Sequence, residues 1–165
     1  MRPVSPARVA ELYRQHIASS TRRERLFVSS IAFFAAFATT RGITHAIRRG
    51  VGPFHNLSVG GRHMHHLVIG IAGLLGTGYL WLVQIGTGDK PGDAGAMSTV
   101  TSVMYGAASA VTLDEFALWL NLEDVYWARQ GRESVDAVIL FGAALSIGLW
   151  GRPFFRDLYR EARRL

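Results

Sequence analysis

Two adjacent carboxylates, Asp114 and Glu115, stand inside a long apolar stretch of the chain. Residues 97–122 are mostly apolar or small, and a segment of this length can cross a bilayer as a helix. An aspartate at the centre of a membrane helix costs about 2.5–3.5 kcal/mol on insertion scales, so such acids need partners and are usually functional. Three histidines, His63, His65 and His66, begin the preceding apolar stretch and are candidate partners.

Histidine and carboxylate side chains together suggest metal chemistry. Imidazole nitrogen and carboxylate oxygen bind Zn, Fe or Mn, and helix bundles build such sites from facing helices. A bound cation would also compensate the charge of the buried acids. The sequence therefore predicts a site for one or two divalent metal ions with the ligands His63, His65, His66, Asp114, Glu115 and Asp136. Two acids closer to the expected water boundary, Glu123 and Asp124, are the candidate catalytic general bases.

A second polar group precedes the histidines. Arg41, His45 and Arg48 recur at helical spacing near the end of the first apolar stretch. Arg48 is placed to extend its side chain to the lipid headgroups. Arg41 and His45 lie deeper and form a further candidate polar site. They leave open an alternative to metal, in which the buried acids are compensated by ion pairs such as Arg41 with Asp114.

Four apolar segments must position these residues. They predict an all-α, polytopic membrane protein whose four transmembrane helices, at about 26–47, 64–85, 97–122 and 134–150, form an antiparallel bundle. Ser5 as N-cap and Pro6 at the first helical position indicate an amphipathic interfacial helix at 5–18. Pro153 is expected to end the fourth span, and a second interfacial helix is expected at 153–164. The whole chain, 1–165, forms a single membrane domain.

Charge sets the expected orientation. Arginines cluster before the first apolar segment and after the last one, which places both termini in the cytoplasm. With four spans, every group named above then lies at the extracytoplasmic end. Small residues on shared helix stripes predict close packing there: His66, Gly70, Gly73 and Thr77 on one helix, and Val103, Ala107, Ala110 and Asp114 on the next.

Composition excludes several classes of protein. The chain has no cysteine, so disulfides and thiolate metal sites are ruled out. The net charge is +6, but the basic residues lie at the two ends rather than along one folded face, and no nucleic-acid partner is expected. The expected partner is the lipid bilayer, and a homo-oligomer is left open.

Two segments, residues 61–70 and 113–127, contain the motifs HMHH and LDEFALWLNLEDVYW. Over about residues 45–136 the chain resembles an uncharacterised actinobacterial family of small four-helix integral membrane proteins. The resemblance implies a bacterial plasma membrane and a four-helix bundle, and it implies no catalytic roles.

Three functions fit these observations. The first is a metal-dependent membrane enzyme, a hydrolase or an oxidoreductase, that acts on a lipid or lipid-linked substrate at the outer leaflet. The second is a non-enzymatic metal-binding or transport protein, although the inner halves of the spans carry few polar groups for a permeation path. The third is a structural membrane protein in which an ion-paired network holds the bundle together.

Overall fold

The described part of the chain folds into five helices and one very short hairpin. The computed structural model describes residues 5–54, 58–59, 62–63, 65–88, 95–115 and 129–164. The helices in these ranges are α1 (Pro6–His16), α2 (Thr21–Arg49), α3 (His66–Leu82), α4 (Ala96–Asp114) and α6 (Arg129–Arg164). Strands β1 (Ser58–Val59) and β2 (Arg62–His63) pair antiparallel, with Ser58 opposite His63. The predicted all-α class is confirmed.

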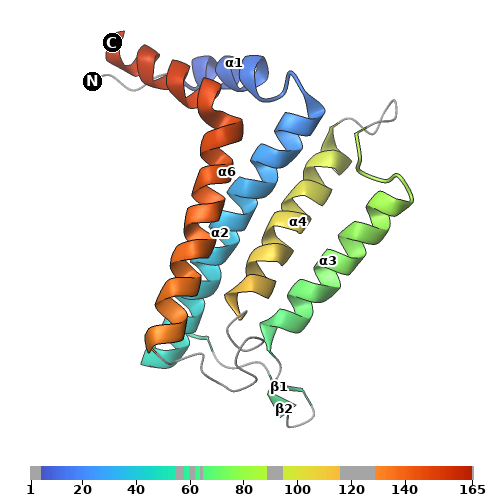
Figure 1. Cartoon of the computed structure of the whole chain (residues 1–165), viewed down its shortest axis with the longest axis vertical. Coiled ribbons are helices and arrows are strands. Elements are labelled where there is room, and N and C mark those ends of the chain that lie inside the picture. Colours follow the sequence, from blue (N-terminus) through green and yellow to red (C-terminus); the bar gives the residue numbers. More distant parts are fainter. Residues whose placement is uncertain are drawn as a thin grey trace.

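The four long helices lie side by side in the order α6, α2, α4, α3 (Figure 1). Helix α2 packs on α4 and α6, and α4 packs on α3. Successive helices run up and down as predicted, and both termini lie at the same end of the molecule (Figure 1). The arrangement differs from a closed bundle, because α3 and α6 occupy the two outer positions of a row.

Helix α2 alone, among the described residues, is both long and apolar enough to cross a membrane. It has 29 residues, about 44 Å at 1.5 Å per residue, and begins after the N-cap Ser20. Only 17% of its apolar stretch is buried inside the molecule, which is far less than a core helix of a soluble protein would show. Helix α3 is apolar but has only 17 residues.

Several helix ends differ from their predicted positions: α2 begins at Thr21 rather than near residue 26, and α6 begins at Arg129 rather than near residue 134. Helix α3 ends at Leu82 rather than near residue 85, because Gln84, Gly86 and Gly88 all take positive φ and turn the chain toward α4. Helix α4 ends at Asp114, with Glu115 as its C-cap, so the two acids lie at a helix end and not within a longer helix. The predicted continuation, residues 116–122, lies outside the described residues.

Pro153 does not end the last helix. Helix α6 continues through it for 36 residues in all, so the predicted fourth span and the predicted C-terminal interfacial helix are one element. Proline removes one backbone N–H and its ring displaces the preceding turn, which bends a helix without necessarily breaking it. The C-terminal part of α6 runs away from the row and lies beside α1 (Figure 1).

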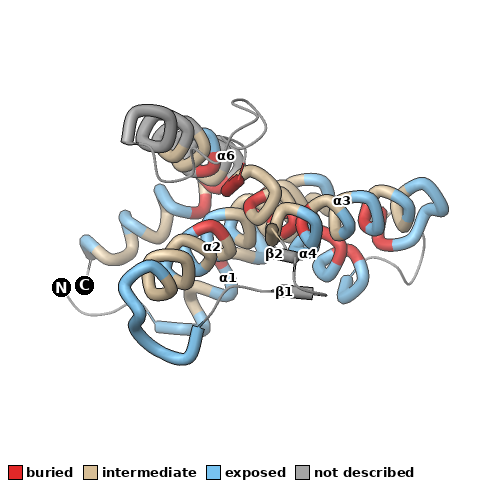
Figure 2. Tube along the Cα trace, turned by 90° about the horizontal axis from the view of Figure 1, so that it is seen from below, coloured by how far each residue is buried: buried red, intermediate tan, exposed pale blue. Residues whose placement is uncertain are grey.

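Small residues set the spacing between the helices, as predicted. A Cβ on Gly73 would lie 2.9 Å from the Cβ of Ala108, and a Cβ on Gly106 would collide with the carbonyl oxygen of Ser29. Gly70, Thr77, Ala110 and Asp114 are buried along these contacts, and Figure 2 shows the buried stretches on the facing sides of the helices. Val103, expected on the inner stripe of α4, is instead 43% exposed.

At the end that carries both termini, α1 is held against α6 by an apolar cluster. Leu12, Ile17, Phe27 and Phe154 are buried together, and Val9 and Tyr13 pack against them. Helix α1 begins as predicted, with Pro6 in its first turn and the Ser5 hydroxyl accepting a hydrogen bond from the N–H of Arg8. The predicted amphipathic N-terminal helix is therefore present, and its apolar face contacts protein.

Candidate functional site

Ionisable side chains from four helices meet at the end of the molecule opposite the termini. Arg41 comes from α2, His66 from the start of α3, Asp114 from the end of α4 and Asp136 from the early part of α6; His65 and Glu115 adjoin His66 and Asp114. Because the helices alternate in direction, late residues of α2 and α4 face early residues of α3 and α6. The structure brings these six of the predicted residues together. We call Arg41, His65, His66, Asp114, Glu115 and Asp136 the ionic cluster.

Asp114 is the most enclosed member of the ionic cluster, with no exposed side-chain surface. Its Oδ1 lies 2.6 Å from Arg41 Nε, in an ion pair that lacks the geometry of a hydrogen bond. Arg41 also donates to Asp136 and, at 3.4 Å, to the backbone carbonyl of Asp114 at the end of α4. A single guanidinium thus joins α2 to both α4 and α6. The cation also opposes the partial negative charge at the α4 C-terminus, where carboxylates are otherwise disfavoured.

The other oxygen of Asp114 contacts His66. Asp114 Oδ2 lies 2.9 Å from His66 Nε2. A carboxylate in this position favours the tautomer that carries its proton on Nε2, and it fixes the plane of the ring. The opposite ring nitrogen, Nδ1, is then directed at Glu115, whose Oε1 lies 3.4 Å away.

Glu115 is the C-cap of α4, and its carboxylate contacts residues at the start of α3. Its Oε1 lies 3.0 Å from His65 Nδ1 and 3.4 Å from His66 Nδ1, so one carboxylate oxygen faces two imidazole nitrogens. Its Oε2 accepts a hydrogen bond of 2.8 Å from the backbone N–H of Leu67, in the first turn of α3. The N-cap residue of α3, His65, makes no side-chain capping bond, so Glu115 takes that role from a neighbouring helix.

The charges of the ionic cluster do not balance when the histidines are neutral. Its three carboxylates face one guanidinium, which leaves a formal charge of −2 on these six side chains. The side chains of Asp114 and Glu115 are almost fully buried, whereas His65 is 40% exposed. Two protons on the imidazoles or one divalent cation would each bring the sum to zero. The exposure of His65 places the Glu115 side of the ionic cluster nearest to solvent.

The structure narrows the predicted ligand set. Asp114 and Asp136 are paired with Arg41, so both belong to an ion-pair network, and the alternative pairing of Arg41 with Asp114 is found. Within the described ranges, no group of three or more histidine and carboxylate side chains is arranged to hold a metal ion. His45 is half-buried on α2. The side chain of His63 and the whole of Glu123 and Asp124 lie outside what the structure describes.

Two members of the site were not anticipated from the sequence. The first is the backbone N–H of Leu67, which binds Glu115. The second is Phe37, whose ring lies 5.4 Å from the Arg41 guanidinium carbon and covers one face of it. The sequence did contain a signal for the first, since the residues before α3 include no Ser, Thr, Asp or Asn that could cap it.

Comparison of the chain with protein-family models, with curated proteins and with solved structures found no match. The resemblance to a family of actinobacterial membrane proteins therefore stays a prediction.

Proposed function

We propose that this chain is a multi-pass protein of a bacterial plasma membrane, with both termini in the cytoplasm. The exposed apolar surface supports this proposal beyond α2. On α3, Leu75, Tyr79 and Leu82 are 65–80% exposed, and α4 exposes Val100 and Tyr105. Soluble proteins seldom leave such contiguous apolar surface open to water. Helices α3 and α4 measure about 26 Å and 29 Å, near the 30 Å thickness of the hydrocarbon core.

The proposed function is binding of one divalent metal ion, Zn, Fe or Mn, at the extracytoplasmic end. The proposed ligands are Glu115, His65 and His66, and Asp114 orients His66 from the far side of the ring. The observation that carries the proposal is that Glu115 Oε1 faces the Nδ1 atoms of both histidines, at 3.0 and 3.4 Å. Two ligands bound about 2.1 Å from one tetrahedral metal lie about 3.4 Å apart, so a cation enters with small side-chain movements.

Two imidazoles and one carboxylate leave coordination positions open. A metal in such a site can polarise a carbonyl or phosphoryl oxygen and activate a bound water, or, as iron, support oxidation chemistry. The substrate class that suits this position is a lipid or lipid-linked molecule that enters from the outer leaflet. Glu123 and Asp124 remain the proposed general bases of that reaction.

Metal content of purified protein tests the binding proposal. We expect about one Zn, Fe or Mn per chain in wild-type protein by elemental analysis, with loss of the metal in Glu115→Gln and in His66→Ala. His16→Ala is the matched control, because His16 is also a histidine paired with a carboxylate, Asp157, but lies at the opposite end. The protein should be purified without chelator and then incubated with each ion. If the wild type still contains no stoichiometric metal, the proposal is wrong.

A second candidate function is structural, and a specific observation favours it. The carboxylates of the ionic cluster already contact Arg41 and the two histidines, and no group of three could hold a metal within the described residues. In this account the contacts of Arg41 and the two histidines with the carboxylates fix the helices. It predicts that His66→Ala lowers the thermal stability while chelators leave the stability of the wild type unchanged.

A further inference from the structure

All of the net charge of the chain resides on the two terminal segments. Residues 5–25 and 151–164 contain ten arginines and four acids, a net charge of +6, whereas basic and acidic residues are equal in number over the rest of the chain. These segments lie at the same end of the molecule, because α1 packs on the C-terminal part of α6 (Figure 1). The molecule is therefore strongly basic at the end opposite the ionic cluster.

The C-terminal part of α6 presents the arginines together with aromatic rings. Arg152, Arg156, Arg160 and Arg163 are exposed and follow one another at intervals of four, four and three residues, which places them on one side of the helix. Phe155 and Tyr159, 41% and 59% exposed, lie beside this row. The opposite side is turned inward, where Phe154 and Leu158 pack in the apolar cluster with α1.

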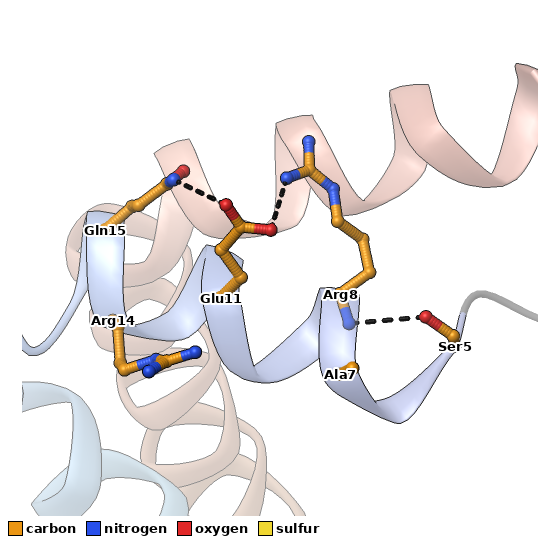
Figure 3. A pocket seen from close by; sticks show the side chains of 6 residues that line it. All are labelled: Ser5, Ala7, Arg8, Glu11, Arg14 and Gln15. Carbon is orange, nitrogen blue, oxygen red and sulfur yellow. Dashed lines mark hydrogen bonds and ion pairs between the residues drawn. The ribbon is translucent and has the colours of Figure 1, made fainter.

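Two arginines of this row, Arg156 and Arg160, contact Asp157, whereas the described residues show no ion pair at Arg152 or Arg163. Asp157 contacts His16 at 2.9 Å and Arg156 at 3.2 Å, and Arg8 contacts Glu161 at 3.5 Å across the α1–α6 contact. On the outer side of α1, the shallow hollow in Figure 3 is lined by Arg8 and Arg14, but there Arg8 and Gln15 both donate to Glu11. That hollow has two arginines and one acid, whereas the α6 face has four arginines and one contacting acid, Asp157, so the α6 face is the stronger site for an anion.

We propose that the exposed face of residues 151–164, formed by Arg152, Arg156, Arg160, Arg163, Phe155 and Tyr159, binds the phosphate groups of anionic phospholipids. Arginine recognises phosphate with paired N–H donors, and aromatic side chains settle at the headgroup level of a membrane. Basic amphipathic segments next to membrane helices bind anionic leaflets in this way. Ile31 and Phe34, in the first half of α2, are also exposed, and they provide an apolar surface for lipid next to this basic end. A nucleic acid would use the charges but not this apolar surface.

The test uses detergent-purified full-length protein and native mass spectrometry with equimolar phosphatidylglycerol and phosphatidylcholine. We expect the wild type to prefer phosphatidylglycerol at least tenfold. Arg152→Gln with Arg163→Gln removes two exposed arginines and leaves the contacts of Asp157 in place. The preference should then fall by about fivefold per arginine, roughly 1 kcal/mol each, so a tenfold preference should disappear.

The matched control is Arg48→Gln with Arg49→Gln, which removes two exposed arginines from the other end of α2. The control should keep the preference within about twofold, and Arg152→Lys with Arg163→Lys should retain most of it. An equal loss in test and control variants, or no preference in the wild type, would overturn the proposal. If the glutamine variant does not fold, the wild-type preference must still fall steeply between 50 and 500 mM salt. Equally selective binding of a DNA duplex, lost in the same variant, would assign the face to nucleic acid instead.

Discussion

Arg41 Nε lies 2.6 Å from Asp114 Oδ1, and this contact joins α2 to α4 where both side chains are nearly closed to solvent. Removing one partner of a buried ion pair leaves an uncompensated charge and costs about 3–5 kcal/mol. Arg41→Gln should therefore lower the thermal stability of the purified protein strongly. Arg49→Gln, a change at an exposed position about two turns later on α2, should alter it by less than about 0.5 kcal/mol.

A double-mutant cycle separates this ion pair from its surroundings. If Arg41 and Asp114 act on each other, the variant that carries both Arg41→Gln and Asp114→Asn should be more stable than the sum of the single losses predicts. Additive losses would show that each residue is needed for other contacts, such as that of Arg41 with Asp136.

We predict that the Glu115 carboxylate caps the N-terminus of α3 in addition to facing the two histidines. Glu115→Ala removes the acceptor of the Leu67 N–H, and we expect a loss of about 1 kcal/mol with faster amide exchange in the first turn of α3. Glu115→Gln keeps an acceptor oxygen, so it should preserve the exchange protection although it removes the charge. Equal exchange in both variants would contradict a capping role.

Gly106 is expected to tolerate no larger residue. A Cβ at this position meets the backbone of Ser29 on α2, which cannot move as a side chain would, so Gly106→Ala should destabilise by about 1–3 kcal/mol or more. Gly76→Ala on α3 is the control, since nothing lies within 4 Å of its added Cβ. That variant should be neutral or slightly more stable in thermal unfolding, because alanine favours helix.

Contact between α1 and α6 should weaken in acid. Burial acts to raise the pKa of Asp157, but Arg156, His16 and Arg160 outweigh it, and the pKa lies below its usual value of 3.8. A depressed pKa contributes stability above pH 3.8 that is lost as pH falls through the lower, folded-state value. Amide exchange in α1 should therefore accelerate below about pH 4. Asp157→Asn should show faster exchange at neutral pH and little further acid dependence.

At high pH we predict a loss of stability that depends on Tyr13, in contrast to the loss in acid that depends on Asp157. Burial, helped by the hydrogen bond to Glu24, raises the pKa of Tyr13 to about 12. A raised pKa favours folding fully below pH 10, and this contribution is lost as pH rises toward 12. The unfolding temperature should fall over that interval, and Tyr13→Phe should remove this part of the fall. An unchanged alkaline profile in Tyr13→Phe would contradict the assignment.

The sequence was sufficient to predict that Arg41, His66 and Asp114 meet, but it could not predict how they pair. Consecutive helices run in opposite directions, so the end of one helix lies near the start of the next. Arg41 and Asp114 lie near the ends of their helices and His66 lies at the start of its own, so all three are at one end of the molecule however the helices pack. Either a metal ion or Arg41 could compensate the negative charge of Asp114, and the sequence is equally consistent with both. Only the distances separate the two, and they assign Arg41 to Asp114.

The errors in the predicted fold concern boundaries that tertiary contacts decide. Pro153 predicts a helix end by local rules, but residues beyond it pack on α1 through Phe154 and Leu158, so the helix continues. Val103 shares a stripe with buried residues of α4, yet α4 packs on both α2 and α3, and in this arrangement Val103 is 43% exposed. Neither outcome can be derived from periodicity alone.

Anomalous scattering from crystals of protein loaded with Zn, Fe or Mn tests the central proposal most directly. The metal-binding account predicts one peak about 2.0–2.2 Å from Glu115 and from the Nδ1 atoms of His65 and His66, with Asp114 still on Nε2 of His66. The contrary result is a metal-loaded crystal with no peak there and with the contacts of Glu115 to both imidazoles unchanged.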